Sequence, residues 1–269
     1  MGRREHMLLA IDVGNTNLVC GLYDGRKLLE FWRLETSQRK SSDEYGIALK
    51  QMFEADGYSF SQVDDIIIST VVPSLTFTLQ HFCEKSFQKS PIIVGPGVKT
   101  GLIVKYDNPK LLGADRIVNS VAAYSKYQAP LIVIDIGTAT TICAVSDKAE
   151  YLGGVIAPGI KISSEALFEK TAKLPRVELE TPKHVICRNT AECMQAGLMY
   201  GHVGMIEYIV KKMKDEIAAE CGFAPGEKKI TVVATGGMSA VIAEATDCID
   251  VVDRRLTLTG LELIYEKNR

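Results

Sequence analysis

The sequence predicts an α/β protein in which one folded core occurs twice. Three observations favour this class: strand-like segments alternate with amphipathic helical ones, a strand-and-turn pattern recurs in the two halves, and the composition is that of an ordinary globular protein. At 269 residues the chain is long enough for two modest domains, each able to bury its own core. The hydrophobic share of 46% excludes a largely disordered chain.

The repeat relates residues 8–24 to residues 131–147, at an offset of 123 residues. Six of the 17 aligned pairs are identical: Leu8/Leu131, Ile11/Ile134, Asp12/Asp135, Gly14/Gly137, Cys20/Cys143 and Asp24/Asp147. Each copy has the pattern of a buried strand, an Asp-x-Gly turn where glycine allows a positive φ, and a returning strand. The repeat therefore predicts two β-hairpins with polar tips, and two unrelated hairpins are the alternative.

In chain order, the first hairpin is followed by helices and strands in alternation. Apolar residues recur at helical spacing over residues 43–55, 75–87 and 114–127, and short apolar runs over residues 66–70 and 92–94 indicate strands. This alternation is typical of a sheet covered by helices.

The second half repeats this order after the second hairpin. Residues 200–219 have an amphipathic helical pattern, residues 229–234 that of a strand, and a further helix is expected near Ser239. We expect the chain to divide into an N-terminal domain of residues 1–114 and a C-terminal domain of residues 115–269. No linker rich in Pro, Ser or Gly separates them, so we expect a tight hinge with a cleft between the domains.

The charge and cysteine content favour a small-molecule partner. With 31 Lys plus Arg against 33 Asp plus Glu, the net charge of −2 gives no general attraction for nucleic acid or an anionic membrane. Apolar runs such as Leu131–Ile134 are far shorter than the ~20 residues of a membrane span. The seven cysteines include no CxxC pair and indicate reduced thiols. We expect a cytoplasmic protein that binds neither nucleic acid nor a membrane.

The two hairpin tips carry groups suited to a nucleotide phosphate. Backbone N–H groups and hydroxyls donate to phosphate oxygens, while a neighbouring carboxylate holds a cation directly or through water. We therefore interpret Asp12 and Asp135 as cation-organising carboxylates. The candidate phosphate or water contacts are Thr16, Asn17, Thr138 and Thr140. A single Asp-x-Gly turn is more typical of a plain hairpin, but its duplication favours a function.

A third glycine cluster, Thr235–Gly237, follows a strand-like run and precedes the helix expected near Ser239. It would either let a flat base or ribose approach the backbone or only form a tight turn, and both interpretations stay open. The sequence contains no GxxxxGK[ST] and no GxGxxG pattern, so P-loop and dinucleotide-binding chemistry have no support.

Together these motifs resemble those of the acetate and sugar kinase, Hsc70 and actin superfamily. The matching stretches are Asp12–Asn17, Asp135–Thr138 and Ala234–Gly237, so the resemblance spans the whole chain. It implies two ribonuclease H-like domains that close over ATP in the cleft between them. Phosphoryl transfer is then expected, with the acceptor still open.

The segment between the repeats is similar to the acceptor-site motif of type III pantothenate kinases. The matching stretches are Tyr106–Pro109 and Leu112–Asn119, followed in the family's order by Gly153–Gly159, Arg188–Thr190 and Met194–Gly197. This resemblance implies ATP-dependent phosphorylation of pantothenate to 4′-phosphopantothenate, the first step of coenzyme A biosynthesis. It also implies a homodimer, Mg²⁺ bridging the phosphates, and a monovalent cation, potassium or ammonium.

The resemblance implies a role for each matching residue. Asp115 is the general base, Asp135 binds the monovalent cation, and Asp12 holds Mg²⁺ directly or through water. The expected ATP contacts are Asp12, Val13, Gly14, Asn15, Thr16, Asn17, Leu18, Val19 and Thr138. The expected pantothenate contacts are Tyr106, Gly113, Ala114, Asp115, Arg116 and Thr190. Independently of the resemblance, Asp115 and Arg116 open an expected helix whose N-terminus favours anions, and a guanidinium suits a substrate carboxylate.

Two other functions stay open. A superfamily kinase for a sugar or short carboxylic acid is disfavoured by the Tyr106–Asn119 segment. A nucleotide-binding accessory regulator of gene expression without turnover is disfavoured by the near-zero charge and by the presence of Asp12, Asp115 and Asp135. Cys187 stands where the family commonly has glycine, which puts only the pocket's shape in doubt.

Overall fold

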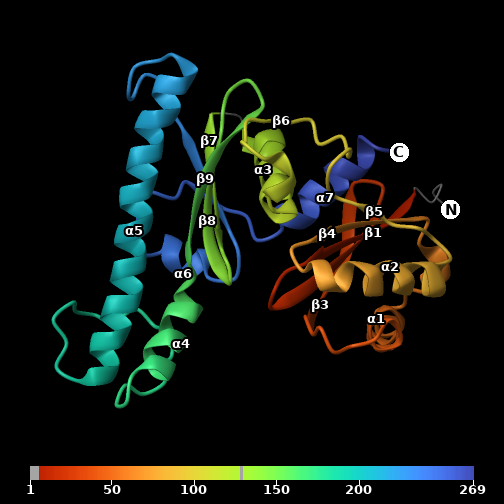
Figure 1. Cartoon of the computed structure of the whole chain (residues 1–269), viewed down its shortest axis with the longest axis horizontal. Helices are drawn as coiled ribbons and strands as arrows, with labels where there is room; N and C mark the ends of the chain where they lie inside the picture. Colours follow the sequence, from red (N-terminus) through yellow and green to blue (C-terminus); the bar gives the residue numbers. More distant parts are fainter. Residues whose placement is uncertain (1–5, 128–129) are drawn as a thin grey trace. The chain divides into compact units, whose positions relative to one another are not determined.

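The computed structural model of the chain describes residues 6–127 and 130–269, which form two units (Figure 1). The first unit contains the described residues of Met1–Gly101 together with Asp107–Ala122 and Arg255–Arg269. The second contains Leu102–Tyr106 and the described residues of Ala123–Arg254. These units differ from the expected division between residues 114 and 115, because the last helix of the chain packs against the central strands of the first unit.

The first unit is built on a five-stranded sheet with the order β3-β2-β1-β4-β5. Its strands are β1 (Met7–Val13), β2 (Asn17–Asp24), β3 (Lys27–Glu35), β4 (Asp65–Thr70) and β5 (Ile92–Ile93). The strands β1, β2 and β3 pair antiparallel, whereas β4 is parallel to both β1 and β5. Its helices are α1 (Ser42–Ala55), η1 (Phe60–Gln62), α2 (Pro73–Phe87), η2 (Pro109–Leu111), the start of α3 (Ala114–Tyr127) and α7 (Leu256–Glu266).

The alternation of side chains along β1 places Asp12 on one particular face of this sheet. Leu9, Ile11 and Val13 belong to the hydrophobic core that the sheet forms with α1 and α2. Leu8 and Ala10 are equally buried but point to the other face, where α7 contacts β1 and β4. Asp12 therefore ends a buried row on the α7 face, at the carboxyl end of the strand.

The second unit has a six-stranded sheet with the order β11-β10-β7-β8-β9-β6. Its strands are β6 (Ile103–Val104), β7 (Leu131–Ile136), β8 (Ala139–Val145), β9 (Glu150–Pro158), β10 (Thr231–Thr235) and β11 (Val251–Val252). Its helices are the end of α3, α4 (Ile160–Lys170), α5 (Thr190–Cys221) and α6 (Ser239–Ala243). Apart from the edge strand β6, strand order and direction match the first unit, so the α/β class and the duplicated ribonuclease H-like core are confirmed.

The register of the two hairpins corrects the sequence alignment by one residue. Ile11 pairs with Cys20 in the first hairpin, whereas the equivalent Ile134 pairs with Ile142 and not with Cys143. The second tip is therefore one residue shorter, and the Cys20/Cys143 match is not an equivalence in space. The two turns do not use the positive φ that glycine allows, because none of the residues with positive φ in the described chain is Gly14 or Gly137.

Several elements escape prediction for physical reasons. The strand β3 lies at the sheet edge and has few buried residues, and β9 carries Gly153 and Gly154, which weaken a strand signal. The helix α5 begins ten residues before the expected start at residue 200. The sequence pattern missed this first part because glycines there lower the helix propensity. In the part of the chain that the structure describes, no helix combines the length and apolarity of a membrane span.

Candidate functional site

The tip of the first hairpin is held by its own backbone and by Thr36, which follows β3. The N–H of Gly14 donates to the carbonyl oxygen of Asn17 over 3.0 Å. The hydroxyl of Thr36 donates to the carbonyl oxygen of Gly14 over 2.8 Å, and its N–H donates to that of Thr16 over 3.0 Å. Asn15, Thr16 and Asn17 are exposed. Their amide and hydroxyl groups are thus presented to solvent on a fixed loop, as an anion site requires.

Each repeated carboxylate has a buried hydroxyl side chain beside it on the neighbouring parallel strand. Asp12 of β1 is in register with Ser69 of β4, and Asp135 of β7 is in register with Thr235 of β10. Ser69 and Thr235 are at most 2% exposed, and the Ser69 hydroxyl has no hydrogen-bond partner among the described side chains and backbone. The sequence alone did not reveal Ser69, and it indicated Thr235 only as part of the Thr235–Gly237 cluster. The pairing of distant strands places both hydroxyls beside the carboxylates.

Two glycines bring backbone close to the second tip. A Cβ on Gly236 would lie 2.5 Å from Oδ1 of Asp135, and the φ of +93° at Gly236 also favours glycine. A Cβ on Gly159 would overlap with the carbonyl oxygen of Thr138, to which the Gly159 N–H donates over 3.2 Å. The Asp135 carboxylate and the Thr138 backbone are therefore packed against residues that tolerate no side chain.

Thr140, expected among the phosphate or water contacts, has a structural role instead. Its hydroxyl is fully buried and forms a hydrogen bond of 2.9 Å with Nε2 of His202, on α5. Burial lowers the pKa of His202, which favours the neutral ring in this apolar setting. The pair thus joins β8 to α5 beneath the tip.

The first turn of α3 carries Asp115 and Arg116. Oδ1 of Asp115 accepts the N–H of Arg116 over 2.8 Å, and a Cβ on Gly113 would lie 2.5 Å from the same oxygen. Burial raises the pKa of the Asp115 carboxyl above the ordinary value for aspartate, and the N–H and the charge of Arg116 offset part of that rise. Arg116 itself is only 5% exposed. The turn therefore holds a half-buried carboxylate with an increased affinity for protons.

The predicted residues are divided between the two units. The segments Asp12–Val19 and Gly113–Arg116 belong to the first unit, whereas Tyr106, Asp135, Thr138 and Thr190 belong to the second. The side chains of Val13 and Leu18 are part of the first core, so only their backbone groups could contact ATP.

In the second unit, the remaining predicted residues lie on separate elements. Tyr106 follows β6, and its ring lies edge-on to that of Tyr151 with the centroids 6.3 Å apart. Thr190 is exposed at the start of α5, where the side chain of Asn189 caps the helix by accepting the N–H of Glu192 over 2.9 Å.

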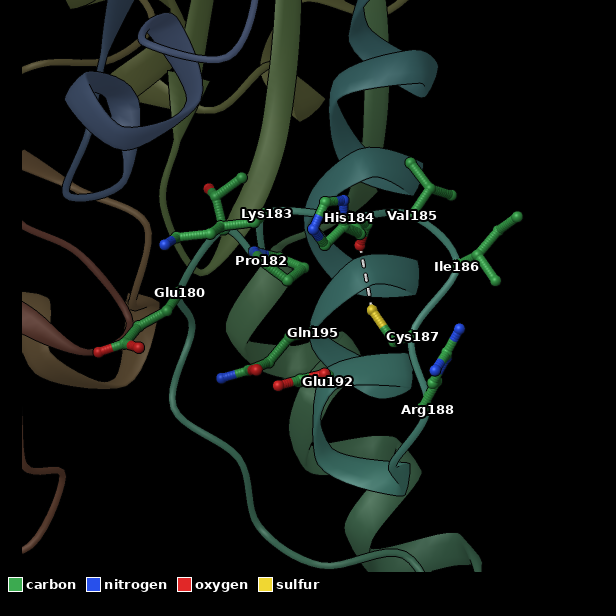
Figure 2. A pocket seen from close by; sticks show the side chains of 11 residues that line it. Glu180, Pro182, Lys183, His184, Val185, Ile186, Cys187, Arg188, Glu192 and Gln195 are labelled. Carbon is green, nitrogen blue, oxygen red and sulfur yellow. Dashed lines mark hydrogen bonds between the residues drawn. The ribbon is translucent and has the colours of Figure 1, made fainter.

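A pocket of about 1050 Å³ lies beside the start of α5 (Figure 2). The segment before the helix forms one wall, and two α5 side chains, Glu192 and Gln195, point into it from the other. The lining residues are Glu180, Thr181, Pro182, Lys183, His184, Val185, Ile186, Cys187, Arg188, Glu192 and Gln195. None of the residues predicted to bind ATP or pantothenate lines this pocket, so it is distinct from the predicted contacts within the second unit.

Comparisons with known proteins agree with this fold. A sequence model of the type III pantothenate kinase family matches residues 8–212 of the chain. A Campylobacter jejuni protein described as a candidate Baf family transcriptional activator is 20% identical, with a TM-score of 0.58 over 97% of this chain and 98% of that chain. A candidate sugar kinase from Cytophaga hutchinsonii is 14% identical, with a TM-score of 0.50 over 97% and 99% of the two chains. At these identities the two structures show a shared fold.

Proposed function

This chain belongs to the type III pantothenate kinase family, and we propose that it transfers the γ-phosphate of ATP to the primary hydroxyl of pantothenate. The observation that carries the proposal is the family match, which includes both hairpin tips and the start of α3. The half-buried Asp115 carboxylate supports it. A general base works best with a pKa closer to neutral pH than that of an exposed aspartate, and burial raises the pKa of Asp115.

In the proposed reaction Asp115 accepts the hydroxyl proton as the pantothenate oxygen attacks the γ-phosphate. The N–H of Arg116 already donates to Oδ1 of Asp115, so Oδ2 is the oxygen we propose for the proton. The guanidinium of Arg116 would pair with the pantothenate carboxylate and orient the acceptor, together with Tyr106 and Thr190. Positioning and charge neutralisation supply most of the rate enhancement in phosphoryl transfer, and the base supplies the remainder.

The oxygen donors at both tips fit the cations that we propose. The Asp12 carboxylate would hold Mg²⁺ directly or through water, and a bound Mg²⁺ would neutralise charge on the phosphates. The Asp135 carboxylate and the carbonyl oxygen of Ile136 both lie against Gly236. Oxygens of these kinds coordinate potassium and accept hydrogen bonds from ammonium. We further propose that the protein works in the cytoplasm as a homodimer.

Arg116→Ala is expected to weaken the apparent affinity for pantothenate by about 10- to 100-fold, because a charged hydrogen bond contributes ~1.5–3 kcal/mol. The KM for ATP should change little. Steady-state kinetics with each substrate varied in turn measures both values, and Arg116→Lys, which keeps the charge without the planar fork, should fall between wild type and alanine. An unchanged KM for pantothenate in a folded Arg116→Ala protein would reassign Arg116 to structure.

Thr36→Val is expected to raise the KM for ATP by about 2- to 10-fold, because a net hydrogen bond is worth ~0.5–1.5 kcal/mol. Valine keeps the shape of threonine but cannot hold the carbonyl oxygen of Gly14, so the first tip loses one of its two Thr36 contacts. Thr36→Ser is the matched control, since it keeps the hydroxyl and should behave as wild type. Equal KM values for all three proteins would show that the tip needs no such support.

The choice of acceptor tests the proposed substrate directly. The protein should release ADP with pantothenate and ignore a hexose. Turnover of a hexose in place of pantothenate would move the assignment to another kinase of the superfamily.

A further inference from the structure

Two cysteines bracket the turn that leads into α5. Cys187 precedes and Cys193 follows the segment Arg188–Thr190, and the sulfur of Cys193 lies 3.5 Å from the carbonyl oxygen of Cys187. The backbone tightens the same turn, because the N–H of Cys193 donates to the carbonyl oxygen of Asn189 over 3.0 Å. The Cys193 side chain therefore reaches back across the first helical turn to the residue that carries the other thiol.

Both thiols are open to small reactants. Cys193 is exposed, and Cys187 is half-buried in the wall of the pocket of about 1050 Å³, with its sulfur 3.0 Å from the carbonyl oxygen of His184 (Figure 2). A second neighbouring pair, Cys20 and Cys83, is fully buried in the first core, where no reactant can approach. Of these two pairs, the one at α5 is therefore accessible to a small reactant.

We propose that Cys187 and Cys193 are a reversible redox site that takes low-molecular-weight disulfides as its oxidant. The thiolate of Cys193 attacks one sulfur of the disulfide, forms a mixed disulfide and releases one thiol. The thiolate of Cys187 then attacks the Cys193 sulfur and releases the second thiol. The protein loses two electrons and two protons, which the two released thiols carry away, and one S–S bond joins the two residues.

The surroundings of the pair suit this order of steps and a labile product. Cys193 is the more exposed of the two thiols, so it makes the first attack on an incoming disulfide. Burial, together with Glu192 and Cys193, raises the pKa of the Cys187 thiol. Closing the bond removes the hydrogen of the Cys187 thiol, and with it the hydrogen bond to the carbonyl oxygen of His184. The closed loop is short and exposed, so the bond gains little chain entropy and is readily reduced.

The consequence for activity rests on the proposed function. The bond would close a loop over residues 188–192, which includes Thr190, a proposed pantothenate contact. Oxidation should therefore raise the KM for pantothenate several-fold and leave the KM for ATP unchanged, because the ATP contacts are on the hairpin tips.

Peptide mass spectrometry of the full-length protein tests the bond without any assay of activity. The protein is incubated with oxidised glutathione, alkylated, and digested with trypsin, which cuts after Lys183, Arg188 and Lys211. The two thiols then lie on separate peptides, 184–188 and 189–211, each with one cysteine. The proposal predicts that oxidation joins these two peptides and that dithiothreitol separates them.

Single variants identify the order of attack and provide the controls. Cys193→Ser should abolish the joined peptides and leave Cys187 largely free, Cys187→Ser should leave glutathione attached to Cys193, and Cys221→Ser should behave as wild type. Only glutathione adducts in wild type, or bonds to other cysteines, would overturn the redox pair. Joined peptides with an unchanged KM for pantothenate would overturn the proposed effect of oxidation on acceptor binding. If the reduced protein turns over no pantothenate, the proposed function fails, and not the redox pair.

Discussion

Asp115→Asn is expected to lower kcat by about 10²- to 10⁴-fold, the contribution of a positioned general base. An amide has nearly the same shape as the carboxylate, and its oxygen can still accept the Arg116 N–H, but it cannot take the proton from pantothenate. ATP binding should persist, because the proposed ATP contacts lie on the hairpin tips. Steady-state kinetics and nucleotide titration measure the two effects separately.

The matched control is Asp247→Asn, an exposed aspartate of the second unit, which should keep wild-type turnover. A near-normal kcat for Asp115→Asn would remove Asp115 from the mechanism. The pH profile gives an independent test: burial raises the pKa of Asp115, so wild-type kcat should fall on acidification at a higher pH than an ordinary aspartate would cause.

The same pKa shift predicts a gain in stability for Asp115→Asn. A carboxyl whose pKa is higher in the folded state costs folding free energy wherever it is ionised, at pH values above that raised pKa, and costs nothing below the unfolded pKa. Asparagine removes this cost, so the Tm at neutral pH should equal or exceed that of wild type, with the difference vanishing in acid. A lower Tm at neutral pH would contradict the burial argument.

Gly236→Ala is expected to destabilise the second unit and to displace the carboxylate of Asp135. The positive φ at Gly236 costs a residue with a side chain ~1–3 kcal/mol, and the new Cβ would lie 2.5 Å from Asp135 Oδ1 and 2.6 Å from the carbonyl oxygen of Ile136. Overpacking of this kind typically costs a further ~1–3 kcal/mol of folding stability. Thermal unfolding should show a lower Tm, and kcat should fall as Asp135 moves.

The neighbouring Gly237→Ala provides the control for this substitution. A Cβ at Gly237 meets no atom within 4 Å and the residue has no positive φ, so its stability should stay within ~0.5 kcal/mol of wild type. Equal Tm values for the two variants would show that the backbone near Asp135 can yield, and the tight packing assigned to this carboxylate would then be wrong.

Local patterns predicted the elements well where periodicity alone decides. The helices expected over residues 43–55, 75–87 and 114–127 correspond to α1, α2 and α3, with boundaries that differ by at most two residues. The apolar spacing that buries one helix face is contained within the helix itself, so it is readable without the rest of the chain. The repeat of the two Asp-x-Gly turns was equally readable, because each turn follows directly on its strand.

Features that depend on distant pairing could not be predicted. The shortening of the second hairpin is visible only in the register of Ile134 with Ile142. Ser69 and Thr235 stand beside the two carboxylates only because β4 and β10 pair with β1 and β7. Thr36 reaches the first tip for a similar reason, since β3 returns alongside β2 and ends next to Thr16.

The central claim is that this chain phosphorylates pantothenate, and a coupled ADP-release assay with Mg²⁺ and ATP tests it most directly. Pantothenate is supplied or omitted, in potassium buffer and again in sodium buffer. We expect ADP release that requires both pantothenate and potassium. Pantothenate-dependent release in sodium as well would keep the kinase but contradict the cation role of Asp135, whereas no pantothenate-dependent release in either buffer would contradict the claim itself.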